Sequence, residues 1–149
     1  MKKVPLRLIN NQIEAKVIID AEVYRIRYKP ITFIVDTGSS RSFISERDAM
    51  QLKLPIDILT NPESIRMGGS KYDLLQTKKM KLMLKTEENT TQEIVMPQFA
   101  ITRATKKTEE ARRESQCLPS ILGTDVFTIN SLLLHFDPRD NDIYVAKKE

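Results

Sequence analysis

The feature that most constrains this 149-residue chain is an apolar run that ends in a carboxylate and a tight turn. Residues 33–35 read Phe-Ile-Val, which predicts a buried β-strand, and Asp36-Thr37-Gly38-Ser39 follows directly. Glycine at position 38 permits a sharp turn and lets another backbone approach closely. Asp36 is therefore expected at the edge of a buried strand, the kind of position where proteins keep a reactive carboxylate.

The composition is that of an ordinary globular domain. Hydrophobic residues make up 40% of the chain, and we expect a single domain over residues 1–149. The apolar runs fall far short of the roughly 20 residues that a membrane helix needs. Pro5 and Arg7 interrupt any apolar signal segment, so we expect a cytoplasmic protein with no membrane partner. Cys117 is the sole cysteine, which excludes an internal disulfide.

The net charge of +4 suggests nucleic-acid binding, but the charge pattern argues against it. Residues 102–116 mix basic and acidic side chains and offer no aromatic ring for base stacking, so we expect an exposed charged surface insertion and no nucleic-acid partner. The sole histidine, His135, lies in an apolar run and is expected in a strand. One Cys and one His give no cluster of metal ligands, so neither a metal nor another cofactor is predicted.

The hydrophobic periodicity along the chain predicts a β-rich domain with short helices. Expected strands cover residues 4–9, 13–23, 24–28, 31–35, 42–45, 65–67, 78–85, 93–100, 132–136 and 143–146. Pro30 is expected in a loop that leads into the next strand. Ser45 and Thr124 are expected to cap short helices over residues 46–52 and 125–129.

Three features together resemble the retropepsin-like aspartic proteases, the single-domain relatives of pepsin. They are the Asp-Thr-Gly-Ser turn at 36–39, the run Ile-Leu-Gly at 121–123 before a short helix, and the closing hairpin around residues 137–141. Viral members usually carry Asp two residues after the first glycine and Arg directly after the second, where this chain has Ser40 and Thr124. The chain is therefore more similar to cellular or prokaryotic members. The resemblance implies an all-β fold, a closed retropepsin-like β domain with short helices and one domain per protomer.

The resemblance also implies roles for the residues of the turn. Asp36 would be the catalytic carboxylate, with Thr37, Gly38 and Ser39 as the active-site scaffold. Thr37 would interlock the two halves of the site by a hydrogen bond across their seam. Independently of the resemblance, the hydroxyl of Ser39 is expected to donate a hydrogen bond to Asp36 and favour its ionised form, unlike the alanine that some relatives have there. An ordinary turn stabilised by an aspartate is the alternative interpretation.

Substrate contacts are expected from two further segments. Met67, Gly68 and Gly69 lie at the tip of an expected hairpin that could close over a substrate as a lid, although glycine pairs also mark plain hairpin turns. By resemblance, Pro119 and Ile121 would line apolar subsites. This arrangement predicts a preference for hydrophobic side chains on either side of the cleaved bond.

The chain contains a single copy of the motif, with no second Asp-Thr-Gly or Asp-Ser-Gly. Water activation by this chemistry needs two carboxylates that share one proton. The sequence therefore predicts a homodimeric aspartic endopeptidase acting on peptide or protein substrates, with one Asp36 from each protomer. The alternative is a non-catalytic module of the same fold that binds peptides or dimerises. Whether the chain is part of a larger polyprotein is left open by its residues.

Overall fold

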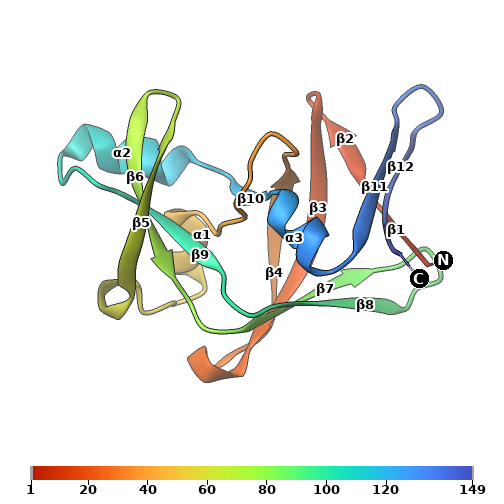
Figure 1. The fold of residues 1–149 in the computed structure, drawn as a ribbon, viewed down its shortest axis with the longest axis horizontal. Coiled ribbons are helices and arrows are strands. Elements are labelled where there is room, and N and C mark those ends of the chain that lie inside the picture. The colour runs from red at the N-terminus through yellow and green to blue at the C-terminus, as the bar shows by residue number, and fades with distance from the viewer. Residues whose placement is uncertain (1, 149) are drawn as a thin grey trace.

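The computed structural model describes residues 2–148, apart from the side chains of residues 61 and 62. This part of the chain forms three β-sheets with short helices at their edges (Figure 1). The strands are β1 (Lys3–Pro5), β2 (Arg7–Ile9), β3 (Gln12–Ala21), β4 (Ile26–Val35), β5 (Thr60–Met67), β6 (Ser70–Gln76), β7 (Met80–Lys85), β8 (Thr91–Met96), β9 (Ala100–Ala104), β10 (Ser120–Leu122), β11 (Leu132–Asp137) and β12 (Asp142–Lys147). The helices are α1 (Glu46–Gln51), α2 (Glu109–Cys117) and α3 (Thr124–Ile129), with 3₁₀ turns η1 (Glu22–Tyr24) and η2 (Ile56–Ile58).

The largest sheet holds the core and runs in the order β10-β4-β3-β7-β8, with β2 paired to β3. Its strands alternate buried and exposed side chains, as the sequence pattern predicts. In β7, for example, Met80, Leu82 and Leu84 are all buried. Each large apolar side chain that leaves water in this way contributes about 1.5–3 kcal/mol to the hydrophobic driving force. Phe33, near the end of β4, is fully buried and meets the ring of Phe99 edge-on at 6.1 Å.

The short strand β10 places the motif turn. It pairs in parallel with the end of β4, so that Ile121 lies beside Ile34. On its other side, backbone hydrogen bonds of 2.9 Å join Ile121 and Phe43 in both directions. The chain after the turn therefore returns alongside β10, and β10 lies between the two segments that flank residues 36–42.

A small sheet, β5-β6-β9, carries the expected hairpin beside α2 (Figure 1). Met67 pairs with Ser70, which leaves Gly68 and Gly69 as a two-residue turn with φ values of +57° and +83°. Positive φ at both turn positions is the geometry that matches the twist of a hairpin and favours glycine. The hairpin prediction is confirmed. A second apolar cluster, centred on Phe43, packs beneath it.

The third sheet, β1-β12-β11, brings the two ends of the described chain together (Figure 1). His135 lies in β11, as expected, and stacks on Tyr144 with ring centroids 4.7 Å apart. No helix within residues 2–148 combines the length and the apolar character that crossing a membrane would require.

Several local expectations are wrong. Residues 42–45 do not form a strand, because Phe43 and Ile44 make only isolated bridges. The expected strand over 93–100 is interrupted between β8 and β9. Pro30 lies inside β4 opposite Ile18, because β10 borders only residues 33–35 and leaves that stretch of β4 with a free edge, where proline is tolerated. The expected strand over 24–28 begins instead at residue 26, after η1. Gly123, and not Thr124, caps α3, and it does so without a side-chain hydrogen bond.

The expected charged insertion at 102–116 is also more integrated than its composition suggests. Residues 102–104 belong to β9, and Thr102 is fully buried. The helix α2 lies on the surface, yet Ser115 on its inner face is fully buried against α1. The buried side chains here are small or polar, so hydropathy alone did not reveal them.

Candidate active site

The carboxylate of Asp36 stands at the exposed tip of the turn that follows β4. Its backbone N–H donates to the carbonyl of Leu122 at 3.0 Å, which fixes the residue to β10. One carboxylate oxygen, Oδ1, accepts a hydrogen bond from the backbone N–H of Gly38 at 2.9 Å. Within the described residues, the other oxygen makes no hydrogen bond to the protomer. Asp36 is thus oriented by the backbone while one oxygen stays available to an external group.

Glycine is required below this turn because backbone atoms approach it closely. A Cβ placed on Gly123 would lie 2.5 Å from the carbonyl oxygen of Ser39 and 2.6 Å from that of Arg41. The same carbonyl of Ser39 accepts a hydrogen bond from the N–H of Thr124 at 2.9 Å. A Cβ on Gly38 would lie 3.1 Å from Oδ1 of Asp36. The two glycines of the motifs therefore let the turn rest on the start of α3 without crowding the carboxylate.

Hydrogen bonds between Ser42 and Asp125, which the sequence did not predict, hold the chain just after the turn. Ser42 is buried, and its backbone N–H donates to Oδ2 of Asp125 at 3.0 Å while its hydroxyl donates to Oδ1. The Ser42 hydroxyl in turn accepts from the N–H of Gly123 at 2.7 Å. Asp125 also accepts from the N–H of Val126 at 2.8 Å. An acidic residue in the first turn of a short helix was the only sequence signal for this contact.

Ser39 behaves differently from the expectation drawn from its hydroxyl group. Its hydroxyl donates to the carbonyl of Arg41 at 2.7 Å and not to the carboxylate of Asp36. The backbone N–H of Gly38 already occupies Oδ1, and the serine makes the short-range bond to the main chain that such side chains commonly form. Ser39 thus stabilises the turn itself.

A pocket of about 350 Å³ opens beside Asp36. It is lined by Asp36, Gly38, Ser39, Ser40, Arg41, Phe43, Ile65, Arg66, Met67, Leu118, Pro119 and Ile121. The predicted catalytic residue and the predicted contacts from Met67, Pro119 and Ile121 therefore meet in one place. Gly68 and Gly69, at the hairpin tip, do not line this pocket.

Thr37 also lies outside the pocket, exposed at the tip of the turn. Across residues 2–148, no hydrogen bond involves its hydroxyl. Thr37 is thus accessible to a second molecule that approaches the turn.

Sequence reasoning missed the charged residues at the pocket. Arg41 forms an ion pair with Glu63 of β5. The hydrogen bond between them raises the pKa of Arg41 and lowers the pKa of Glu63. The alternation of Glu63, Ile65 and Met67 along one strand was the available signal, because residues at this spacing share a face.

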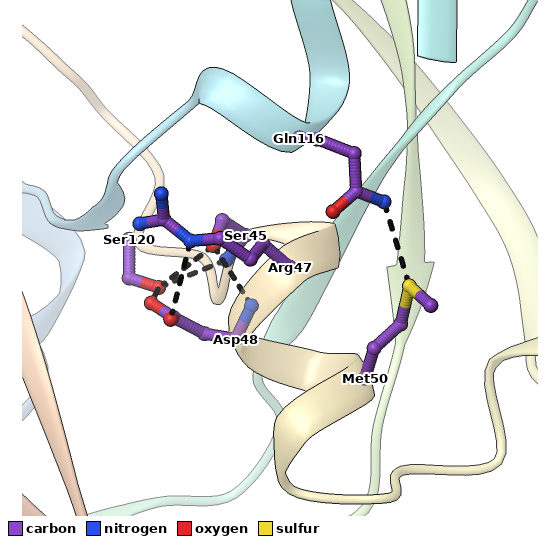
Figure 2. Close-up of polar contacts among 6 residues, drawn as sticks. All are labelled: Ser45, Arg47, Asp48, Met50, Gln116 and Ser120. Atoms are coloured by element: carbon purple, nitrogen blue, oxygen red, sulfur yellow. Dashed lines mark hydrogen bonds and ion pairs between the residues drawn. The ribbon is translucent and has the colours of Figure 1, made fainter. Parts of the chain in front are cut away.

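A buried polar network fixes the wall of the pocket to α1 (Figure 2). Ser120, directly after Pro119, donates its hydroxyl to Oδ2 of Asp48 at 2.6 Å and accepts from the N–H of Ser45 at 2.9 Å. The hydroxyl of Ser45 accepts from the N–H of Asp48 at 3.2 Å, which confirms Ser45 as the cap of α1. Arg47 lies 3.9 Å from the Asp48 carboxylate on its outer side.

The helix α2 packs against the same helix α1 (Figure 2). Gln116 of α2 donates to the sulfur of Met50 at 3.4 Å, and Ser115 donates to Glu46 at 3.4 Å. Burial raises the pKa of Glu46. From the other face of α2, Glu114 accepts a hydrogen bond at 2.6 Å from Ser70, which directly follows the two-glycine turn at the hairpin tip. The pocket wall, α1, α2 and the hairpin therefore form one connected unit.

Comparison with known proteins agrees with this geometry. Residues 23–128 match the family model described as "gag-polyprotein putative aspartyl protease". The chain belongs to this family. The matched range includes the motif turn, the hairpin and β10, and the expected retropepsin-like fold is confirmed. No curated protein matches the sequence.

Two solved structures share the fold. A retropepsin-like aspartic protease from Rickettsia conorii aligns over 97% of this chain and 87% of its own, with a TM-score of 0.56 and 14% sequence identity. The retroviral protease-like domain of Ddi1 from Leishmania major aligns over 91% of this chain and 94% of its own, with a TM-score of 0.52 and 11% identity.

Proposed function

We propose that this protein is a homodimeric aspartic endopeptidase that hydrolyses peptide bonds with a water molecule activated between two Asp36 carboxylates. The observation that carries the proposal is the state of Asp36 in the single protomer. Its carboxylate is exposed, held by one backbone N–H, and placed at a pocket whose other walls are mostly apolar. One protomer supplies only half of the carboxylate pair that the chemistry requires.

A two-fold axis beside the turn would complete the site. An isologous interface joins the same surface patch of both protomers, so a residue close to the axis lies near its own copy. Two carboxylates at contact distance cannot both ionise, so the pair shares one proton. The ionised partner takes a proton from the attacking water while the protonated partner donates to the carbonyl oxygen of the substrate. The product of this step is a tetrahedral diol, without an acyl-enzyme.

The remaining site residues have roles that follow from their positions. Thr37, exposed and without a hydrogen bond inside the protomer, is available to bond across the seam. The N–H of Gly38 orients each carboxylate. Met67, next to the two-glycine tip, contacts the substrate when the hairpin closes over it, and Pro119 and Ile121 accept hydrophobic side chains on either side of the cleaved bond.

Cleavage of unstructured peptides between pH 3 and pH 7 tests the proposal. The wild-type protein should cleave, and Asp36→Asn should lose essentially all turnover because the pair can no longer hold an ionised base. Asp140→Asn is a matched control, since Asp140 is an exposed acid in the β11–β12 turn. Analytical ultracentrifugation should show a dimer at high micromolar concentration. Full activity in Asp36→Asn, or activity from a strictly monomeric protein, would refute the proposal.

A second candidate is a module of this fold that binds peptides without cleaving them. The hydrogen bond from Ser39 to the carbonyl of Arg41 favours it, because Asp36 lacks the second donor that the hydroxyl of Ser39 was expected to supply. Peptide binding without turnover across the whole pH range, together with unchanged binding in Asp36→Asn, would support this candidate.

A further inference from the structure

The pocket beside Asp36 contains a positive charge that the proposed chemistry does not use. Arg41 lines the pocket, and its side chain is 36% exposed. Asp36 is the one acidic residue among the lining residues, and most of the others are apolar or carry small hydroxyl groups. A substrate side chain that reaches Arg41 therefore meets a guanidinium beside an apolar surface.

The partner of Arg41 inside the protomer is replaceable. Glu63 lies on the same face of β5 as Ile65 and Met67, and its side chain is 48% exposed. An exposed ion pair of this kind contributes little to stability, so a competing carboxylate can displace it. A second acid near Arg41, Asp125, is already committed to hydrogen bonds with Ser42 and Val126.

We propose that Arg41 is a specificity-determining residue that binds an aspartate or glutamate side chain of the substrate, in exchange for Glu63. The guanidinium group presents several N–H donors in a planar fork that suits a carboxylate better than an amide. The substrate class is then a peptide with hydrophobic residues at the cut and an acidic residue near them. As a statement about cleavage, this inference rests on the proposed function, whereas the binding preference does not require turnover.

Arg66 is the other cation at the pocket, but its position in β5 argues for a smaller role. It alternates with Ile65 and Met67, whose side chains pack on the apolar cluster around Phe43, so its own side chain belongs to the opposite face of the strand. Its cross-strand neighbour is Lys71. Arg66→Gln therefore tests whether any charge near the hairpin is sufficient.

A set of fluorescent peptides with one fixed hydrophobic pair tests the inference. Glu, Gln or Lys is placed in turn at each flanking position, and binding to the Asp36→Asn protein is measured by anisotropy at pH 6, where glutamate is ionised. At one or two positions, Glu should bind about tenfold more tightly than Gln, with Lys weakest, as expected for a charge-assisted hydrogen bond. The wild-type protein should show the same order in kcat/KM.

Variants of the ion pair should move this preference in defined directions. Arg41→Gln should abolish the difference between Glu and Gln, and Arg41→Glu should favour the Lys peptide. Glu63→Gln should strengthen binding of the Glu peptide several-fold, because the internal competitor is gone. Arg113→Gln is the matched control, since Arg113 also pairs with a glutamate at 2.9 Å but lies on α2 outside the pocket.

Equal binding of the Glu and Gln peptides at every position would overturn the inference, as would a preference that survives in Arg41→Gln or disappears in Arg66→Gln alone. If Arg41→Gln does not fold, the response to Glu63→Gln decides the question, because no strengthening refutes the exchange. Binding preference without cleavage would refute the proposed function and leave this inference standing. Cleavage without a preference for the Glu peptide would support the proposed function and refute this inference.

Discussion

Replacing Gly123 by alanine should displace the turn that carries Asp36 and destabilise the protein. The added Cβ would lie 2.5 Å and 2.6 Å from two carbonyl oxygens, whereas ordinary contacts of a Cβ begin near 3.4 Å. The turn or α3 must therefore move by roughly 0.9 Å at the closer contact. Both obstructing atoms belong to the backbone, so no side chain can rotate away.

The cost can be set against the general range for overpacked interiors. Inserting a methyl group into a well-packed interior lowers the free energy of unfolding by about 1–3 kcal/mol. The backbone atoms around Gly123 cannot rotate away, so we expect a loss of about 3 kcal/mol. For a domain of this size, such a loss lowers Tm by about 10 °C. A displacement of about 1 Å at a reacting group can also reduce kcat/KM by about 100-fold.

Urea unfolding and peptide cleavage measure the two effects separately. Gly38→Ala is the matched control, because its Cβ meets a single side-chain atom, Oδ1 of Asp36, at 3.1 Å. It should lose activity with a much smaller loss of unfolding free energy. If Gly123→Ala unfolds within about 0.5 kcal/mol of wild type and keeps native peptide binding, the turn does not rest on this glycine as described.

Three other substitutions test the surrounding structure. Ser120→Ala should lower the free energy of unfolding by about 2 kcal/mol, because the buried carboxylate of Asp48 loses its donor, and a loss below about 0.5 kcal/mol in urea unfolding would contradict the network. Glu46→Gln should stabilise the protein near pH 7 and not at pH 3. Burial raises the folded-state pKa of Glu46, so ionisation of this carboxyl disfavours the folded state and its cost is complete only above that pKa. An equal change in the free energy of unfolding at both pH values would exclude this cause. Gly69→Ala should cost about 1 kcal/mol, because alanine is strained at φ +83°, and should raise KM in cleavage assays, whereas unchanged values would show that the tip is not held in this turn.

Much of the fold was accessible from local sequence patterns. Alternating apolar residues marked β7, two adjacent glycines marked the hairpin tip, and Ser45 marked the start of α1. Each of these signals depends on residues a few positions apart, so the sequence carries it directly. The motif turn at residues 36–39 was accessible for the same reason, since an apolar strand followed by Asp-Thr-Gly is a contiguous signal.

The parts that could not be predicted depend on distant partners. The pairing of Arg41 with Glu63 and of Ser42 with Asp125 joins segments that only the folded chain brings together. Residue type alone does not say whether a serine caps a helix, as Ser45 does, binds a distant carboxylate, as Ser42 does, or faces solvent. Pro30 was misplaced because a strand edge is a property of the sheet and not of the strand's own residues.

The support of Asp36 by Leu122 and Gly123 has a consequence for when the candidate site forms during synthesis. The carboxylate is encoded in the first quarter of the chain, but the strand that fixes it emerges from the ribosome only in the last quarter. A nascent chain therefore carries the Asp36 carboxylate before the strand that orients it, and contacts of such long sequence separation form slowly. Under the proposed function, cleavage by this chain therefore requires that residues 120–123 have been synthesised and have paired with β4.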